Sequence, residues 1–198
     1  MASFGSQHGP LVWIDCEMTG LDHMKDRIIE IAVLITDGNL ELVDEVGCHY
    51  VVKTSKEVLD SMGEWCTTQH GRSGLTNEAI NSPHTPQQVA SYVLAYIKRW
   101  APEPHTGILA GSSVHADARF LGAKGPDAEE SSDTGVWHEI IQHLHYRIVG
   151  TLLHAYDNVC AHTPSFQDVS SIKELCRRWY PEEAQCFKES AAKESSHR

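Results

Sequence analysis

Two carboxylates stand two residues apart in Asp15-Cys16-Glu17, directly after the apolar run Leu11 to Ile14. Side chains two positions apart on a β-strand point to the same face, so on a strand these two acids can share a metal ion. The pattern alone is weak, because the chain repeats it in Asp127-Ala128-Glu129, which we interpret as solvated surface. The first pair differs in its position, since an acid that follows a buried strand is costly unless it is paired.

Asp117 and His197 are two further residues whose types suit chemistry. Asp117 follows the apolar segment Ile108 to Val114, where a helix cap is the simpler interpretation, and His197 stands beside the last residue, where an idle surface position is simpler. Carboxylates bind divalent cations, and histidine with its ordinary pKa near 6.5 suits proton transfer near neutral pH. Together with Asp15 and Glu17 they favour a functional site over coincidence.

The first fifty residues predict three consecutive strands. Apolar or alternating runs cover Leu11 to Glu17, Arg27 to Thr36 and Glu41 to Val52, and the turn sequence Asp37-Gly38-Asn39 separates the second from the third. Short connections between successive strands are typical of an antiparallel meander. This meander would carry Asp15 and Glu17 on its first strand.

The period then changes to that of helices. Val58, Leu59, Met62 and Trp65 share one helical face, and a clearer helix begins at Thr85-Pro86, a cap followed by proline. Its apolar residues keep the helical spacing: Val89, Val93, Tyr96, Ile97 and Trp100.

Strands and helices alternate in the second half of the chain. Ile108 to Val114 and Leu144 to Val149 predict strands, and the capping box Ser171 to Glu174 opens a further helix. This order predicts an α/β fold with a mixed sheet. Two segments fit poorly, residues 122–139 and 150–167, because long loops without periodicity are uncommon in compact domains.

Several longer motifs resemble one known family. They are DCEMTGLD at 15–22 with the following RIIEIAVLITD, LDSMGEWCTTQHGRSGL at 59–75, AGSSVHAD at 110–117, LHYRI at 144–148, DVSSIKELCRRWYPEE at 168–183 and SHR at 196–198. The chain resembles oligoribonuclease over most of its length outside the two poorly fitting segments. Oligoribonuclease is a DEDD-type 3′→5′ exonuclease with a ribonuclease H-like fold, so the resemblance implies that fold.

The resemblance implies a metal-dependent catalytic site. Asp15, Glu17 and Asp117 match three of the four carboxylates that hold two Mg²⁺ or Mn²⁺ ions, and His197 matches the general base that takes a proton from the attacking water. Gathered carboxylates repel one another and take up protons, so divalent cations are needed to keep them ionised together.

It also implies residues that contact a short single-stranded RNA. Leu21 and Trp65 match residues that flank the bases, and core packing is the alternative for Trp65. Met18 and Thr19 lie where the family's backbone approaches the terminal nucleotide, and the remaining matches are His70, Ser112 and Ser170. Tyr146 and Arg147 match a pair that acts in the neighbouring subunit of a homodimer, and an ordinary surface position is the alternative for Arg147.

Charge and composition limit the partners. The net charge is −11, with 27 acidic and 16 basic residues, which argues against gripping long nucleic acid but is compatible with a dinucleotide-sized substrate of few phosphates. The six cysteines form no C-x-x-C pair and predict free thiols in a reducing compartment. No apolar run predicts a membrane span, and the first ten residues show no targeting signal, so we expect a cytoplasmic protein, or a mitochondrial one if the natural N-terminus is longer.

The sequence departs from the family in two respects. The family continues beyond the position of Arg198 with the fourth metal-binding Asp and a final helix, so we expect a single exonuclease domain over 1–198 that is incomplete at its C-terminus. Residues 150–167 have no counterpart in the family, and deleting them restores its continuous motif; residues 122–139 are a second predicted insertion.

Three functions follow as hypotheses. The first is a 3′→5′ exoribonuclease that degrades short oligoribonucleotides to mononucleotides with two metal ions. The second is a DEDD exonuclease that acts on DNA ends. The third is an inactive relative that binds a nucleotide or a partner, which the missing Asp supports.

Overall fold

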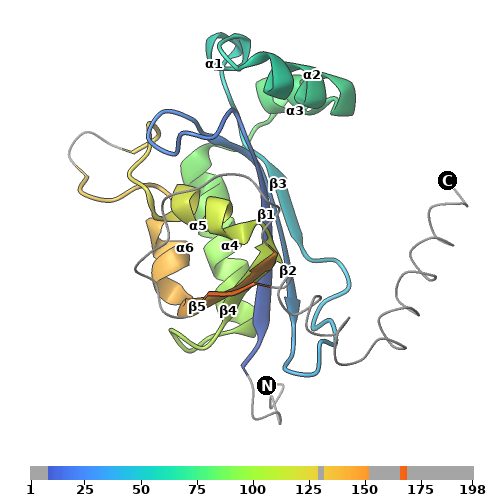
Figure 1. Cartoon of the computed structure of the whole chain (residues 1–198), viewed down its shortest axis with the longest axis vertical. Coiled ribbons are helices and arrows are strands. Elements are labelled where there is room, and N and C mark those ends of the chain that lie inside the picture. Colours follow the sequence, from blue (N-terminus) through green and yellow to red (C-terminus); the bar gives the residue numbers. More distant parts are fainter. Residues whose placement is uncertain (1–8, 129–131, 152–165, 169–198) are drawn as a thin grey trace, which may run out of the picture.

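The computed structural model describes residues 9–128, 132–151 and 166–168, which form one mixed sheet with helices (Figure 1). The strand order is β3-β2-β1-β4-β5-β6. The strands are β1 Leu11–Met18, β2 Ile28–Thr36, β3 Cys48–Val51, β4 Ile108–Ser112, β5 His145–Thr151 and β6 Phe166–Asp168. β1, β2 and β3 pair antiparallel, whereas β4, β5 and β6 run parallel to β1. The predicted α/β fold, a meander followed by alternating helices and strands, is confirmed.

The helices lie in two groups. In Figure 1, α4, α5 and α6 gather on one side of the sheet, whereas α1, α2 and α3 project beyond the end where β1 finishes. Their bounds are α1 Lys56–Asp60, α2 Glu64–Ser73, α3 Leu75–Asn81, α4 Pro86–Trp100, α5 Val114–Gly122 and α6 His138–His143. None of the helices in the described ranges is long and apolar enough to cross a membrane.

Alternation along β1 decides which residues reach the core. Val12, Ile14 and Cys16 are buried and join the cluster beneath α4, α5 and α6, whereas Asp15 and Glu17 are exposed on the opposite face. Asp15 and Glu17 therefore share a face, as predicted from their spacing, and this face bears none of that core.

The predicted helix at Thr85-Pro86 is confirmed as α4. Thr85 and Gln88 form a complete capping box, and Val89, Val93 and Ile97 are buried against the sheet. These residues hold α4 in the helix layer that also contains α5.

Some predicted bounds were wrong. The third strand is limited to β3. Among the residues from Glu41 to Gly47, only Leu42 makes a bridge to β2. The helical face from Val58 to Trp65 is divided between α1 and α2, with Gly63 at the N-terminal cap of α2. β5 extends through Gly150 to Thr151, α6 was not anticipated, and the capping box at 171–174 lies outside the described residues.

Candidate active site

The site begins where β1 extends past its neighbour. β4 pairs with β1 only from Leu11 to Trp13, so the end of β1 has no strand on that side. Asp117, on the first turns of α5, fills the space: its Oδ1 accepts a hydrogen bond of 2.9 Å from the backbone N–H of Cys16. Asp117 is only 4% exposed. The structure thus brings Asp117 to the residue that stands between Asp15 and Glu17.

The three acids are in an environment that disfavours their charged forms. Burial raises the pKa of Asp117 to about 6, and the neighbouring charge of Asp15 adds to the effect. Asp15 and Glu17 are only partly covered, but this partial burial still raises the pKa of each carboxyl, and the charge of Glu30 contributes in both cases. At Glu17 the charge of His70 opposes the shift. A nearby cation would reverse this cost, since opposite charge favours the ionised carboxylate.

Glu30 is a fourth acid that the sequence analysis did not single out. It lies on β2 directly opposite Glu17 in the antiparallel register, where cross-strand side chains are neighbours. His49 on β3 holds it, with Nε2 2.5 Å from the Glu30 carboxylate. The signal in the sequence was the lone acid of an apolar strand, but its position opposite Glu17 requires the strand register.

His70 joins α2 to the end of β1. It is buried, and its Nε2–H donates a hydrogen bond of 2.9 Å to the carbonyl oxygen of Met18. Because a carbonyl only accepts, this contact places the proton on Nε2. The other ring nitrogen, Nδ1, lies 3.9 Å from the Glu17 carboxylate. His70, which was predicted as a substrate contact, is therefore placed next to a predicted metal ligand.

The loop from Thr19 to Arg27 follows the site directly. Thr19 is buried, and its hydroxyl donates to Asp26 and accepts from the backbone N–H of Arg27, both at 3.0 Å. Asp26 also accepts from the backbone of Asp22 at 2.9 Å. At Gly20 a Cβ atom would lie 2.4 Å from the Asp26 carboxylate, so a larger residue there would displace this carboxylate from its hydrogen bonds.

The two predicted base-flanking residues are exposed near this loop. Leu21 is 89% and Trp65 70% exposed, so the alternative of core packing for Trp65 is wrong. Trp65 lies on the first turn of α2, and its neighbour Cys66 is close enough to Glu17 and Asp26 that their charges help burial to raise the pKa of its thiol. Ser112 ends β4 and is exposed, on the strand that precedes Asp117.

Tyr146 and Arg147 lie elsewhere. They stand in an irregularity of β5, between the pairs Ile108–His145 and Leu109–Ile148. Tyr146 is 74% exposed, its ring stacks on His145 at 4.4 Å, and the Arg147 guanidinium lies 5.7 Å from its centroid. The structure does not bring these two residues to the acids of the same chain.

The structure does not test the remaining predicted roles. Ser170 and His197 lie outside them. Within the described ranges no three His, Cys, Asp or Glu side chains converge at ligating distance, so the metal-ligand roles stay predictions. The donor chemistry nevertheless fits a hard cation, because carboxylate oxygens are the ligands of Mg²⁺ and Mn²⁺ and a bound cation would offset the raised pKa of each of these carboxyls.

Comparison with known proteins identifies the family. The exonuclease (RNase T) family matches residues 12–198. The mitochondrial oligoribonuclease of Homo sapiens is 41% identical over 198 residues, which are 100% of this chain and 69% of that protein. The oligoribonuclease of Halorhodospira halophila is 40% identical, covering 91% of this chain and 81% of that protein. The chain belongs to the oligoribonuclease family of exonucleases. It spans only 56% of the length of the Schizosaccharomyces pombe relative.

Solved structures agree with this family in fold. One structure of exonuclease I matches with a TM-score of 0.54 at 14% identity, over 88% of this chain and 31% of that chain. Exonuclease I of E. coli in complex with a dT13 oligonucleotide matches with a TM-score of 0.53, also at 14% identity, over 88% of this chain and 31% of that chain. The predicted membership of the oligoribonuclease family is thus confirmed, together with its fold.

Proposed function

We propose that this chain is a 3′→5′ exoribonuclease that hydrolyses short oligoribonucleotides to nucleoside monophosphates. The observation that carries the proposal is the hydrogen bond from Cys16 to Asp117, because it joins the third acid to the strand that bears Asp15 and Glu17. The names of the oligoribonuclease relatives support the choice of substrate.

Asp15, Glu17 and Asp117 would hold the cations. Bound divalent cations of the Mg²⁺ or Mn²⁺ type supply positive charge that stabilises the attacking and leaving oxygens in phosphodiester hydrolysis. His70 orients the end of β1 through the Met18 carbonyl, and Leu21 and Trp65 present apolar surfaces on which bases stack without regard to sequence. His197 is proposed as the base that receives the proton of the attacking water.

The substrate is proposed to be about two nucleotides long. A chain of net charge −11 gains little from contacts along a long phosphate backbone, because that affinity depends on many basic residues. A dinucleotide requires few such contacts.

Turnover of a 5′-phosphorylated diribonucleotide in Mg²⁺ or Mn²⁺ tests the proposal. We expect monophosphate products from the diribonucleotide, slower turnover of a long single strand, and no products from Asp15→Ala. Faster digestion of long DNA would instead support the DNA-acting alternative. Binding of the diribonucleotide without any turnover, in this chain and in one extended with the family's C-terminal segment, would support the inactive relative.

Tyr146 and Arg147 are proposed to act in the partner subunit of a homodimer. Leu109 on β4 is paired both with Val12 on β1 and with Ile148, the residue after Arg147 on β5. Tyr146 and Arg147 therefore lie level with the start of β1 and two strands away from it. With about 3.3 Å per residue and 4.8 Å between strands, their backbone is roughly 14 to 22 Å from Asp15 and Glu17. This separation in one chain supports action across a subunit boundary.

Mixing two inactive variants tests this role. Each site of an Asp15→Ala dimer lacks a metal ligand, and each site of an Arg147→Ala dimer lacks the arginine. A mixed dimer has one site with both, so we expect about half of its sites to recover activity. If Arg147 serves its own subunit, mixing restores nothing; the same mixture made without residues 150–167 controls for displacement of Arg147 by that segment. The cytoplasmic location and the two insertions stay predictions.

A further inference from the structure

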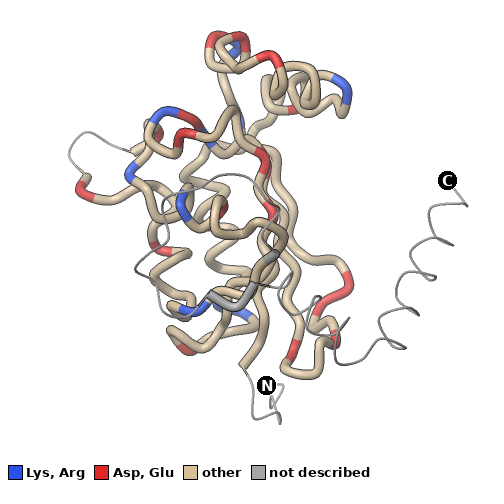
Figure 2. The backbone as a smooth tube through the Cα atoms, in the orientation of Figure 1, with Lys and Arg blue, Asp and Glu red and all other residues tan. Residues whose placement is uncertain are grey.

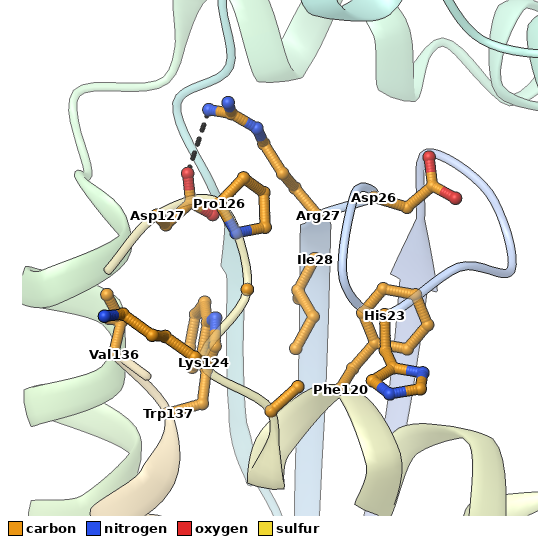
Figure 3. Close-up of a pocket in the computed structure, with 12 residues that line it drawn as sticks. His23, Asp26, Arg27, Ile28, Phe120, Lys124, Pro126, Asp127, Val136 and Trp137 are labelled. Atoms are coloured by element: carbon orange, nitrogen blue, oxygen red, sulfur yellow. Dashed lines mark hydrogen bonds and ion pairs between the residues drawn. The ribbon is translucent and has the colours of Figure 1, made fainter. Parts of the chain in front are cut away.

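A segment made up of residues 123–128 and 132–137 lies against the loop that follows the site. Residues of both line one pocket, with His23 and Arg27 from the loop and Lys124, Pro126 and Trp137 from the segment (Figure 3). His23 also meets Phe120 of α5 edge to face, with ring centroids 6.3 Å apart. This segment falls within the first predicted insertion, residues 122–139. Residues of the predicted insertion therefore line the pocket beside the loop.

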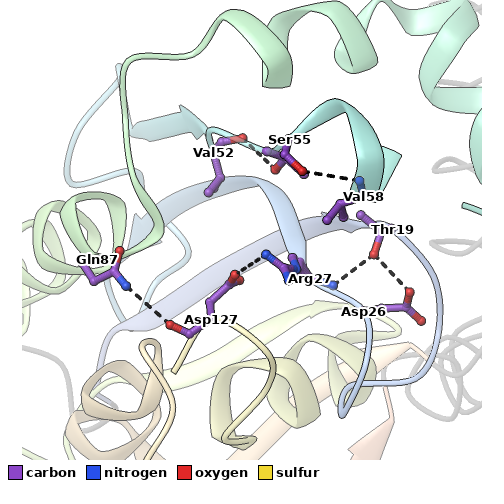
Figure 4. Close-up of polar contacts among 9 residues, drawn as sticks. Thr19, Asp26, Arg27, Val52, Ser55, Val58, Gln87 and Asp127 are labelled. Carbon is purple, nitrogen blue, oxygen red and sulfur yellow. Dashed lines mark hydrogen bonds and ion pairs between the residues drawn. The ribbon is translucent and has the colours of Figure 1, made fainter. Parts of the chain in front are cut away.

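One ion pair joins the two. The Arg27 guanidinium donates to Asp127 at 2.9 Å, and the side chains are only 33% and 13% exposed (Figure 4). The interpretation of Asp127 as solvated surface was therefore wrong. Burial raises the pKa of Asp127, which Arg27 opposes, and a buried acid of this kind depends on its partner.

Asp127 is also fixed through its backbone. Its carbonyl oxygen accepts a hydrogen bond of 3.4 Å from Gln87 on α4 (Figure 4). Because α4 is packed on the sheet through its buried face, this hydrogen bond links Asp127 to the helix layer as well as to its own segment. The ion pair therefore connects this layer to Arg27.

Arg27 in turn closes the base of the loop. Its carbonyl accepts from the backbone N–H of Thr19, and its own N–H donates to the Thr19 hydroxyl, both at 3.0 Å. Thr19 stands two residues after Glu17, and the loop between Thr19 and Arg27 carries the exposed Leu21. A displacement of Arg27 would therefore move both the end of β1 and Leu21.

We infer that the Arg27–Asp127 ion pair is a latch through which residues 123–128 hold the loop 19–27 in the conformation that binds a short oligoribonucleotide. Asp127 is a positioning residue in this inference, since it acts through Arg27. The substrate part rests on the proposed function, whereas the mechanical part, the ordering of the loop, does not.

Hydrogen exchange of the full chain tests the mechanical part. Asp127→Asn removes the charge but keeps the shape and the backbone bond to Gln87. We expect amides of the loop 19–27 to exchange about tenfold faster, while those of Val12 to Ile14 in β1 and those of β4 do not change. The matched control is Asp133→Asn, which removes an exposed acid of the same segment and should change nothing. Unchanged exchange in Asp127→Asn would overturn the latch.

A double variant separates the latch from misfolding. Asp127→Asn leaves Arg27 partly buried without its partner, whereas Arg27→Gln with Asp127→Asn leaves a neutral amide pair. If the ion pair acts as a latch, Asp127→Asn and Arg27→Gln each make the amides of the loop exchange faster. The double variant then recovers part of the protection of these amides from hydrogen exchange. Loosening throughout the sheet in the single variants, with no recovery in the double, would show a folding defect and overturn the inference.

Binding of a 5′-phosphorylated diribonucleotide in Ca²⁺ and its turnover in Mg²⁺ test the substrate part. We expect Kd and KM to rise about tenfold in Asp127→Asn with kcat within about twofold, because a mobile loop must be ordered again on binding. A loosened loop with unaltered affinity would overturn the substrate part. If the unaltered chain neither binds nor cleaves the diribonucleotide while the exchange result holds, the proposed function fails and the mechanical latch stands.

Discussion

Replacing Asp117 with asparagine should make the metal-free protein more stable. Burial raises the pKa of Asp117 from 3.8 to about 6, which means that the folded chain holds this proton more tightly than the unfolded chain. The charged form therefore costs stability above pH 6, and the cost is absent below about pH 3.8. A shift of this size corresponds to about 3 kcal/mol at most, since one pKa unit is about 1.4 kcal/mol.

Asparagine suits this test because its carbonyl oxygen can still accept the N–H of Cys16. Only the charge is lost, and the hydrogen bond of 2.9 Å keeps its acceptor. We expect the free energy of unfolding at pH 7.5 to rise by about 1 to 3 kcal/mol in urea titrations with EDTA. The difference should disappear near pH 4. Asp117→Ala is the control, because it removes the acceptor as well as the charge and leaves a buried N–H unpaired.

Added Mg²⁺ or Mn²⁺ should reverse the order of stabilities. A cation bound only by the folded state stabilises it, so the unaltered chain gains stability and the Asp117→Asn chain gains less. The reasoning is refuted if Asp117→Asn is less stable than the unaltered chain at pH 7.5 in EDTA. Such a result would mean that the carboxylate charge is already balanced within the protein.

Three other perturbations have distinct outcomes. His70→Ala should lower the free energy of unfolding by about 1 to 3 kcal/mol in urea, because the Met18 carbonyl loses its buried donor. Glu30→Gln should weaken Mn²⁺ binding about threefold to tenfold in titrations, because it removes a negative charge opposite Glu17. Trp65→Ala should weaken diribonucleotide binding by about 1 to 3 kcal/mol and leave the melting temperature unchanged, because the ring is exposed.

Local patterns predicted the strands and the capped helix, but not the true end of every element. β1 begins with the apolar run Leu11 to Ile14, β2 is apolar apart from Glu30 and Thr36, and α4 has both its cap and its buried stripe. The third strand was predicted to be too long because Leu42 and Val46 continue the alternating pattern of β3 into the residues that precede it. Both side chains are exposed in the structure. Alternation shows which side chains could face a core; strand pairing decides which residues do.

The sequence predicted which residues belong to the candidate site, but not how they lie relative to one another. Asp15 and Glu17 share a face by spacing alone, but the contact of Asp117 with Cys16 arises because β4 ends before β1 does. Glu30 stands in an apolar run and becomes a neighbour of Glu17 only through register. Asp127 was misjudged for the same reason, since its partner Arg27 is 100 positions away in the chain.

The charges around the site predict that substrate binding requires a cation. Figure 2 shows acidic positions on the central strands, and the basic residues of the adjacent loop are already paired: Lys25 with Asp22 and Arg27 with Asp127. A phosphate approaching Asp15 and Glu17 therefore meets net negative charge unless divalent cations are bound. We expect EDTA to abolish binding of a fluorescent 5′-phosphorylated diribonucleotide, and Ca²⁺ to restore it without turnover. Undiminished binding in EDTA would favour the alternative of an inactive relative that binds a nucleotide, since such a site must hold the phosphate with the protein's own groups.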